Sequence, residues 1–249
     1  MNKLILVIYL FNLSLEKCIN AMSQLNLAFY AYFYGSNNNK SFKIPELPSL
    51  KYNCYYYTNN KTMYDMLNDT HWIGIYDDKP SNDDLIEGCM IGKHVKTMPQ
   101  EYAELKDYDY LCYLDSKLDK VDEKFVEDYI DRFFIQQNYA LLLRHHWFIS
   151  NKVNEELRMS MFQLRYKMEE EKYIQYINNQ INNGLSDTTP THCACGFLIR
   201  NMKHPIINEI NTTWYNHIQE CGIQDQISFF FVKQLFNDYI YPFKEIPFV

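Results

Sequence analysis

Short apolar runs separated by turn residues dominate the first half of the sequence. The runs at residues 25–34, 52–57, 71–76 and 108–114 have the length of strands. Turn-forming residues such as Gly35, Asn59 and Asp115 follow them. This pattern predicts four strands between residues 22 and 115.

Helical spacing dominates the second half. Residues 122–134 have apolar positions at helical spacing, and residues 154–182 form a long stretch without Gly or Pro. Residues 213–221 and 224–237 complete the predicted helices. Strands that alternate with helices predict one α/β domain with a mixed, mainly parallel sheet flanked by helices. In such sheets ligands bind beyond the carboxyl ends of the strands.

Charge and cysteine content narrow the functional classes. The chain has 24 basic and 31 acidic side chains, with a formal net charge of -7 and no long basic run. This balance argues against nucleic acid as a partner. Seven irregularly spaced cysteines favour a reducing compartment over a disulfide framework. The richness in Tyr, Asn, Lys and Ile is typical of an AT-rich genome, such as that of a large DNA virus or an AT-rich microbe.

The N-terminus is the part of the chain with several interpretations. Residues 4–11 are apolar and too short to span a bilayer. Residues 1–21 can be a signal or anchor, a buried element, or an extension ahead of a true start at Met22. We expect the domain to cover residues 22–249. The cytoplasm of an infected host cell is the favoured location, and a secretory lumen is expected if the extension is a signal. Membrane association stays open.

Asp115 is the first candidate for chemistry, because it directly follows the apolar strand 108–114. A carboxylate at a strand's carboxyl end can hold Mg²⁺ or Mn²⁺ against a diphosphate. Asp107 and Asp109 form an Asp-x-Asp pattern, but they lie at the amino end of the same strand. We therefore favour Asp115. A turn-forming role for this residue is the alternative.

Small and polar residues follow two other predicted strands. Gly35 and Ser36 would let the backbone approach a nucleotide, and Thr58 and Asn59 could hydrogen-bond a base. We therefore expect these four residues at a nucleotide-binding edge.

Lys93 and Lys96 form a compact basic pair in a segment that we interpret as another loop at this edge. Lysine ammonium groups are suited to phosphate. The alternative is that both are ordinary surface lysines.

Several motifs occur along the chain in a fixed order. Those in the first half are Phe33-Tyr34-Gly35, Tyr57-Thr58-Asn59, Lys96-Thr97-Met98-Pro99 and an Asp-Tyr-Asp-Tyr strand that runs into Asp115-Ser116-Lys117. Those in the second half are His145-His146 and the segments 160–166, 196–200, 214–215 and 224–229. Together these motifs resemble a family of compact GT-A-type glycosyltransferase-like domains of plants, bacteria and large DNA viruses, closest to the viral members. The resemblance covers about residues 25–240.

The resemblance implies a GT-A-like, Rossmann-like fold and the transfer of a sugar. The donor would be a UDP- or GDP-sugar, and the acceptor a glycan or glycoprotein. Mn²⁺ or Mg²⁺ at Asp115 is the implied cofactor, in the Asp115-Ser116-Lys117 site. On this hypothesis Lys93, Lys96 and Arg200 contact phosphate. Asp225 contacts the acceptor hydroxyl as a general base, and Gln226 orients a sugar hydroxyl.

Two departures from the family pattern leave alternatives open. Lys117 stands where a ligand-type residue is expected, so its ammonium group can replace the metal ion. Gln224 stands where the family has an arginine. A catalytically inactive nucleotide-sugar-binding module and a surface interaction protein are therefore the alternatives. For His145, His146 and His192 we favour structural roles over metal binding.

Overall fold

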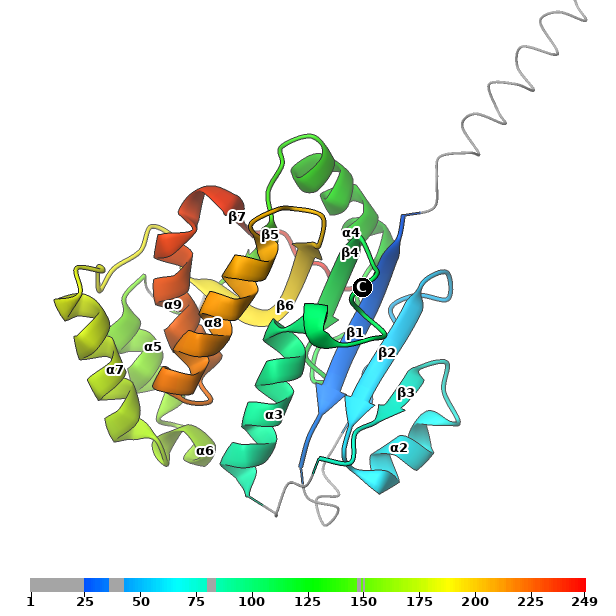
Figure 1. Cartoon of the computed structure of the whole chain (residues 1–249), viewed down its shortest axis with the longest axis horizontal. Coiled ribbons are helices and arrows are strands. Elements are labelled where there is room, and N and C mark those ends of the chain that lie inside the picture. The colour runs from blue at the N-terminus through cyan, green and yellow to red at the C-terminus, as the bar shows by residue number, and fades with distance from the viewer. Residues whose placement is uncertain (1–24, 36–42, 80–83, 147–148, 150) are drawn as a thin grey trace, which may run out of the picture.

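Seven strands form a single mixed sheet in the computed structural model, which describes residues 25–35, 43–79, 84–146, 149 and 151–249. The strand order is β3-β2-β1-β4-β6-β5-β7 (Figure 1). Only β6 runs antiparallel to its neighbours, β4 and β5. The predicted mixed, mainly parallel sheet is thus confirmed. The strands are β1 (Leu27–Phe33), β2 (Asn53–Thr58), β3 (Ile73–Tyr76), β4 (Tyr110–Leu114), β5 (Leu141–His145), β6 (Cys193–Asn201) and β7 (Ile240–Phe243).

The register brings the carboxyl ends of the first strands to one edge. Phe33 of β1 lies opposite Thr58 of β2, which lies opposite Tyr76 of β3. β4 also runs parallel to β1. Asp115, directly after β4, therefore lies at this carboxyl edge. The Asp-x-Asp pair at residues 107 and 109 precedes β4 and lies at the opposite edge.

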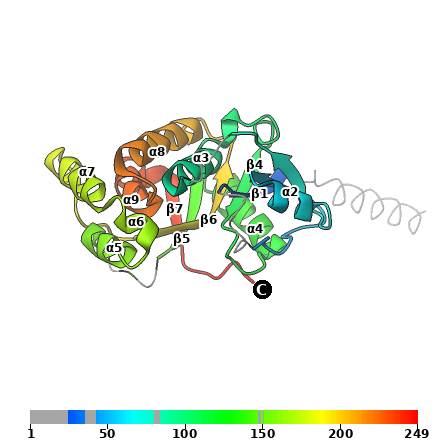
Figure 2. The ribbon, with the colours of Figure 1, turned by 90° about the horizontal axis from the view of Figure 1, so that it is seen from below.

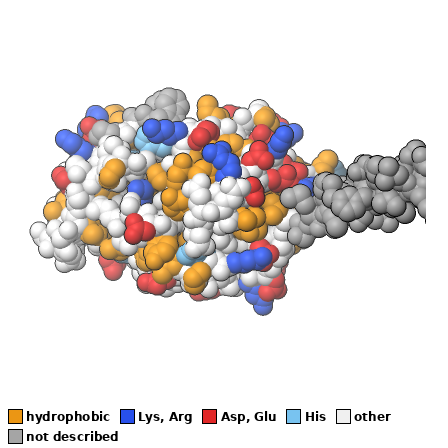
Figure 3. All heavy atoms as spheres, turned by 90° about the horizontal axis from the view of Figure 1, so that it is seen from above, with side chains coloured by type: hydrophobic (Ala, Val, Ile, Leu, Met, Phe, Trp, Pro, Cys, Tyr) orange, Lys and Arg blue, Asp and Glu red, His pale blue; other side chains and the backbone are white. Residues whose placement is uncertain are grey.

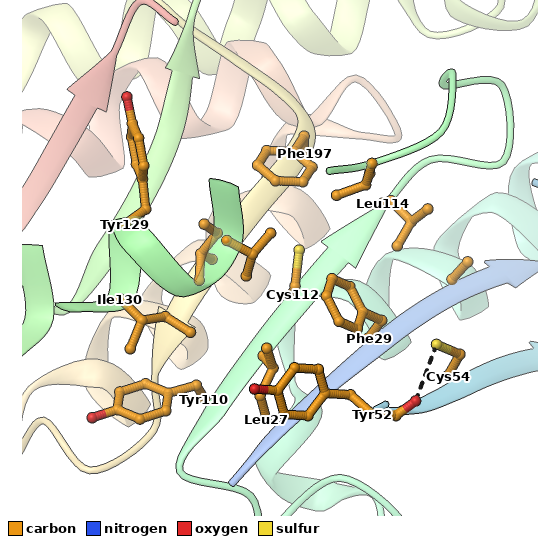
Figure 4. Close-up of a cluster of buried hydrophobic side chains, with 14 of the residues drawn as sticks. Leu27, Phe29, Tyr52, Cys54, Tyr110, Cys112, Leu114, Tyr129, Ile130 and Phe197 are labelled. Carbon is orange, nitrogen blue, oxygen red and sulfur yellow. Dashed lines mark hydrogen bonds between the residues drawn. The ribbon is translucent and has the colours of Figure 1, made fainter. Parts of the chain in front are cut away.

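Helices cover both faces of the sheet, because the strands alternate apolar residues between two cores. On β1, Leu27 and Phe29 enter one core and Ala28 and Tyr30 enter the other. Figure 4 shows part of the first core, against which α4 packs. The helices are α2 (Lys61–Leu67), α3 (Leu85–Thr97), α4 (Glu123–Tyr129), α5 (Val153–Ser160), α6 (Leu164–Lys167), α7 (Glu170–Asn182), α8 (Ile207–Cys221) and α9 (Asp225–Leu235), with short helical turns η1 (Pro99–Glu101), η2 (Ile130–Ile135) and η3 (Asn237–Tyr239).

The prediction of one helix over residues 154–182 was wrong, because the segment forms α5, α6 and α7. Val153, Tyr166 and Tyr176 all enter one core with residues of α9. In a straight helix, residues 153 and 176 would lie roughly 35 Å apart, about twice the length of α9. The chain therefore turns twice and wraps around α9, although its helix propensity is continuous.

Lys93 and Lys96 lie on helix α3, which corrects the prediction of a loop at these positions. Asp84 caps the helix by accepting hydrogen bonds from the backbone N–H groups of Ile86 and Glu87. Gly88 and Gly92 weaken the helical pattern. A side chain at Gly92 would lie 2.1 Å from Cε2 of Tyr32, so the close approach of α3 to β1 requires glycine there.

The surface shows no basic face in the view from above, where basic and acidic side chains are interspersed (Figure 3). Within the described ranges, no helix has the length and apolar character needed to cross a bilayer. The expected boundary between residues 21 and 22 lies outside the described residues.

Candidate functional site

A cavity of about 370 Å³ opens at the carboxyl edge of the sheet. Figure 2 looks at the molecule from below and shows α3, α6 and α9 lying close together beside β6. These helices, the residues after β1 and β4, and the beginning of β6 line the cavity. Its lining residues include Tyr32, Tyr34, Gly35, Asp84, Lys93, Lys96, Tyr113, Asp115, Ser116, Lys117, Arg165, Tyr166, Cys195, Gly196, Gln224, Asp225 and Gln226.

Asp225, the first residue of α9, is held by two lysines of α3. Nζ of Lys93 lies 2.8 Å and Nζ of Lys96 lies 2.6 Å from the same carboxylate oxygen, Oδ2. Burial alone would raise the pKa of Asp225, but the two ammonium groups outweigh it and hold that pKa well below its usual range. Conversely, burial would lower the pKa values of both lysines, and the carboxylate raises them instead. All three groups are therefore charged, and Asp225 is a weak base.

Asp115 is the more accessible carboxylate, with 27% of its side chain exposed. Tyr113 donates its hydroxyl hydrogen to Oδ1 of Asp115 at 2.6 Å. Oδ2 lies 3.6 Å from Nζ of Lys117 and faces Gly196, where an added Cβ would come within 3.0 Å of it. The absence of a side chain at Gly196 keeps Oδ2 open towards the cavity.

The implied divalent cation does not fit the side chains of this cavity. In the described part of the chain, no three His, Cys, Asp or Glu side chains are placed to hold a metal ion. Asp225 is already bound by two ammonium groups, and Asp115 has Lys117 beside it. Asp84, the third lining carboxylate, accepts two backbone hydrogen bonds as the N-cap of α3. A cation placed here would be repelled by the nearby lysines and would find no cluster of ligands among the described side chains.

Aromatic rings form one wall of the cavity. Tyr32 stacks on Tyr113, with ring centroids 5.7 Å apart, and packs against Tyr34 at 6.2 Å. Tyr34 donates a hydrogen bond to Asp77 in the loop after β3, at 3.0 Å. The ring faces of these tyrosines offer an apolar surface that suits a flat ring or the face of a sugar.

A buried polar network around Glu156 supports the side of the cavity formed by α9. Oε1 of Glu156 accepts hydrogen bonds from the amide groups of Gln224 and Gln226, both at 3.0 Å. Oε2 lies 2.8 Å from Nε2 of His192, and Ser160 donates to Oε1 at 3.3 Å. The network fixes the orientation of Gln226, a lining residue, from α5 and the segment before β6.

We predict that Glu156→Ala lowers the free energy of unfolding by roughly 2–4 kcal/mol, because all four side chains that contact this carboxylate lose a hydrogen bond. For a chain of this size the melting temperature should fall by roughly 4–16 °C, which circular dichroism can measure. Glu171→Ala, at an exposed position of α7, is the matched control and should change stability by about 0.5 kcal/mol or less. Equal melting temperatures of the two variants would rule out the structural importance of the network.

The structure brings most of the predicted site residues together. Eight of them line the cavity, namely Gly35, Lys93, Lys96, Asp115, Ser116, Lys117, Asp225 and Gln226. Ser36 lies outside the described residues. These eight residues therefore share one cavity, and the contacts described above change the roles predicted for Asp225 and the two lysines of α3.

Thr58 and Asn59 do not line the cavity, so their predicted contact with a base needs correction. Thr58 is fully buried and accepts a hydrogen bond from the backbone N–H of Asn60. Asn59 accepts a hydrogen bond from the backbone N–H of Gly35 at 3.0 Å and donates to the carbonyl of Lys79. Asn59 therefore shapes the loop that carries Gly35.

The predicted phosphate contact of Arg200 is wrong. Arg200 is fully buried at the other end of β6, between the sheet and α8. It donates hydrogen bonds to Asn211 at 2.9 Å and to the hydroxyl of Tyr30 at 2.7 Å. Tyr30 in turn donates to the carbonyl of Lys96, so Arg200 helps to fix α3 rather than a ligand.

Several lining residues were missed because their importance depends on tertiary contacts. Arg165 and Tyr166 belong to the segment 160–166, which carried the resemblance, but their place beside α9 follows from the turn between α5 and α6. Gly196 belongs to another such segment, 196–200. Nothing in the sequence distinguishes Glu156 from the other acidic residues of the predicted polar helix.

Comparison with known proteins gives a fold. No protein-family model matches the sequence, and no curated protein matches it. Core-mannan synthase A (CmsA/Ktr4) from Aspergillus fumigatus, in its Mn/GDP form, aligns with a TM-score of 0.50 and 14% identity over 90% of this chain and 74% of that chain. The chain has a GT-A fold.

Two further solved structures are similar at lower scores. The apo structure of the bifunctional glycosyltransferase WbbM has a TM-score of 0.46 and 9% identity, over 90% of this chain and 39% of that one. The mannosyltransferase Ktr4p from S. cerevisiae has a TM-score of 0.36 and 11% identity, over 84% and 62%. The expected GT-A-like, Rossmann-like architecture is thus confirmed through core-mannan synthase A.

Proposed function

We propose that the protein is a glycosyltransferase, which moves a sugar from a nucleotide-diphosphate sugar to a hydroxyl group of a glycan or glycoprotein. The observation that carries this proposal is the cavity at the carboxyl edge of a GT-A sheet, where cationic side chains and the accessible carboxylate Asp115 face one space. The Mn/GDP form of core-mannan synthase A supports the donor class, and both UDP- and GDP-sugars are candidates.

The cations of the cavity would stabilise the leaving diphosphate. Lys93, Lys117 and Arg165 line the cavity from three different segments, α3, the loop after β4 and α6. As the bond between the sugar and the diphosphate breaks, negative charge grows on the leaving oxygen. Fixed positive charges near that oxygen lower the barrier, which is commonly the largest electrostatic contribution of an enzyme.

Asp115 takes the role of general base that the sequence assigned to Asp225. A carboxylate bound by two ammonium groups has little affinity for a proton, whereas Asp115 has an oxygen open to the cavity. The acceptor oxygen would form a bond to the anomeric carbon as its proton passes to Asp115, and the diphosphate would leave with the bonding electron pair. Such a single displacement inverts the anomeric carbon.

A panel of nucleotide-sugars tests the donor class. A ligand that binds only the native state at 100 times its Kd adds about 2.7 kcal/mol to stability, so the melting temperature should rise by roughly 5–10 °C. We expect this shift with one UDP- or GDP-sugar and a much smaller one with the free monosaccharide. Release of the nucleoside diphosphate, followed by chromatography, measures turnover. A panel without any shift or turnover would rule out the transferase.

A binding module without catalysis is the second candidate. The low basicity of Asp225 favours it, because only one carboxylate of the predicted pair is then left for chemistry. On this alternative one nucleotide-sugar shifts the melting temperature, but no nucleoside diphosphate is released with any glycan acceptor. The same panel therefore separates the two candidates.

A further inference from the structure

The lysine pair of α3 carries more positive charge than its carboxylate can balance. Lys93 and Lys96 both bind Oδ2 of Asp225. One carboxylate neutralises one ammonium group, so Lys93, Lys96 and Asp225 together have one excess positive charge, which the nearby Asp115 offsets only in part because it also faces Lys117. Placing such a charge in a largely buried position is costly unless a further anion binds there.

The side chains of the two lysines differ in how exposed they are and therefore in whether they can contact such an anion. Lys96 is 1% exposed, and its Nζ lies 4.8 Å from the ring centroid of Tyr113 and 5.7 Å from that of Trp214. Lys93 is 12% exposed and lines the cavity. Lys96 is therefore fixed on Asp225, whereas Lys93 can turn towards a ligand without leaving the carboxylate entirely.

Two further cations face the cavity from less constrained positions. Lys117 is 72% exposed and lies 3.6 Å from Asp115, a distance at which the pair is only loosely held. Arg165 lines the cavity with its guanidinium group 4.5 Å from the ring centroid of Tyr166, and its Nε donates to Oε1 of Gln163 at 3.1 Å. These contacts use the ring face and Nε, not the two terminal nitrogens. The lining thus combines four cations with three carboxylates, in a chain whose net charge is -7.

On the basis of the proposed function, we propose that the donor diphosphate binds directly to Lys93, Lys117 and Arg165, without a divalent cation held by the protein. Lys93 is shared between Asp225 and the diphosphate, and Lys96 keeps Asp225 in place. Because Asp84 caps α3, Asp115 and Asp225 are the carboxylates that offset the four cations, and two positive charges remain. A nucleotide-sugar diphosphate is a dianion and balances these two charges. Asp115 and Asp225, which already have ammonium partners, then need no metal ion.

Titration calorimetry with UDP and GDP tests this binding mode on the full chain. We expect one nucleotide to bind in excess EDTA with a Kd within about threefold of that in Mn²⁺, and to bind more weakly as salt is raised. Lys93→Gln and Lys117→Gln should each weaken binding about tenfold or more, because each removes a charge-assisted contact. Lys93→Arg should retain most of the affinity.

Lys124→Gln, at an exposed position of α4 outside the cavity, is the matched control and should bind as the wild type does. Lys117 is mostly exposed, so Lys117→Gln should fold as the wild type does. Weaker nucleotide binding by this variant would therefore not be a consequence of unfolding. Binding that requires Mn²⁺ and is unchanged in Lys117→Gln would overturn the inference and leave the proposed function standing. The absence of nucleotide binding under both conditions would overturn the proposed function as well.

Discussion

Asp225→Asn is expected to lower the free energy of unfolding by about 3–5 kcal/mol, because it leaves two largely buried ammonium groups without their counter-charge. Lys93 and Lys96 lie within 2.8 Å of Asp225, and an amide cannot neutralise either of them. For a domain of this size the melting temperature should fall by roughly 6–20 °C. Chemical denaturation with equal m values for both proteins would show that stability, not compactness, has changed.

Asp109→Asn is the matched control for this loss. Asp109 also pairs with a lysine, Lys203, at 2.5 Å, but this lysine is 58% exposed. Exposed pairs contribute about 0–1 kcal/mol, so this variant should melt close to the wild type. If Asp225→Asn were as stable as Asp109→Asn, the stability of the folded protein would not depend on the carboxylate that pairs with Lys93 and Lys96.

The pH dependence of the Asp225→Asn effect has a definite sign. The pKa of Asp225 is lowered in the folded protein, so its ionisation contributes stability above the unfolded value of about 3.9. That contribution is lost as the pH falls through the folded value. The difference in stability between the wild type and Asp225→Asn should therefore be constant from about pH 5 to 8 and narrow below about pH 4.

Asp115→Asn is expected to lower kcat by a factor of about 10²–10⁴, the usual contribution of a general base. The amide keeps the size of the side chain and can still accept the hydroxyl hydrogen of Tyr113, so the fold should be preserved. Nucleotide affinity in EDTA should be unchanged or slightly higher, because a negative charge near the diphosphate is removed. Steady-state kinetics and titration calorimetry on the same preparation measure both quantities.

The result separates the two roles considered for Asp115. A variant that keeps its turnover would exclude Asp115 as the proton acceptor. A variant that loses affinity only in the presence of Mn²⁺ would instead make Asp115 a metal ligand, against the inference of a metal-independent site. Asp109→Asn, at the opposite edge of the sheet, again serves as the control and should retain wild-type kinetics.

Local patterns were sufficient to predict the fold class. The four predicted strands match β1 to β4 within about two residues, because each is a short apolar run that ends at turn residues. The helices predicted at 122–134 and 224–237 are also present in the structure. Apolar residues at helical spacing mark the face of a helix that packs against the core, so a local pattern was again sufficient. Periodicity did not predict the antiparallel β6 or the edge strand β7, because their neighbours in the sheet are distant in sequence.

The candidate site was predicted in part. Asp115 was found from its place after an apolar strand, which is a rule about sheets and needs no side-chain geometry. No local pattern in the sequence indicates which charged side chains contact one another in the folded protein. Arg200 looked like a phosphate ligand until its burial against Tyr30 was known, and Asp225 looked like a base until its lysines were in place.

The sequence by itself determined the alternation of strands and helices, the carboxyl edge of the sheet and the carboxylate of Asp115 at that edge. The tertiary structure alone decided which charges meet. Lys96 and Asp225 are 129 positions apart in sequence yet 2.6 Å apart in space. Burial and distance set the strength of a charge interaction, and neither is encoded in local spacing. The protonation states and chemical roles of the site therefore depend on packing between α3 and α9.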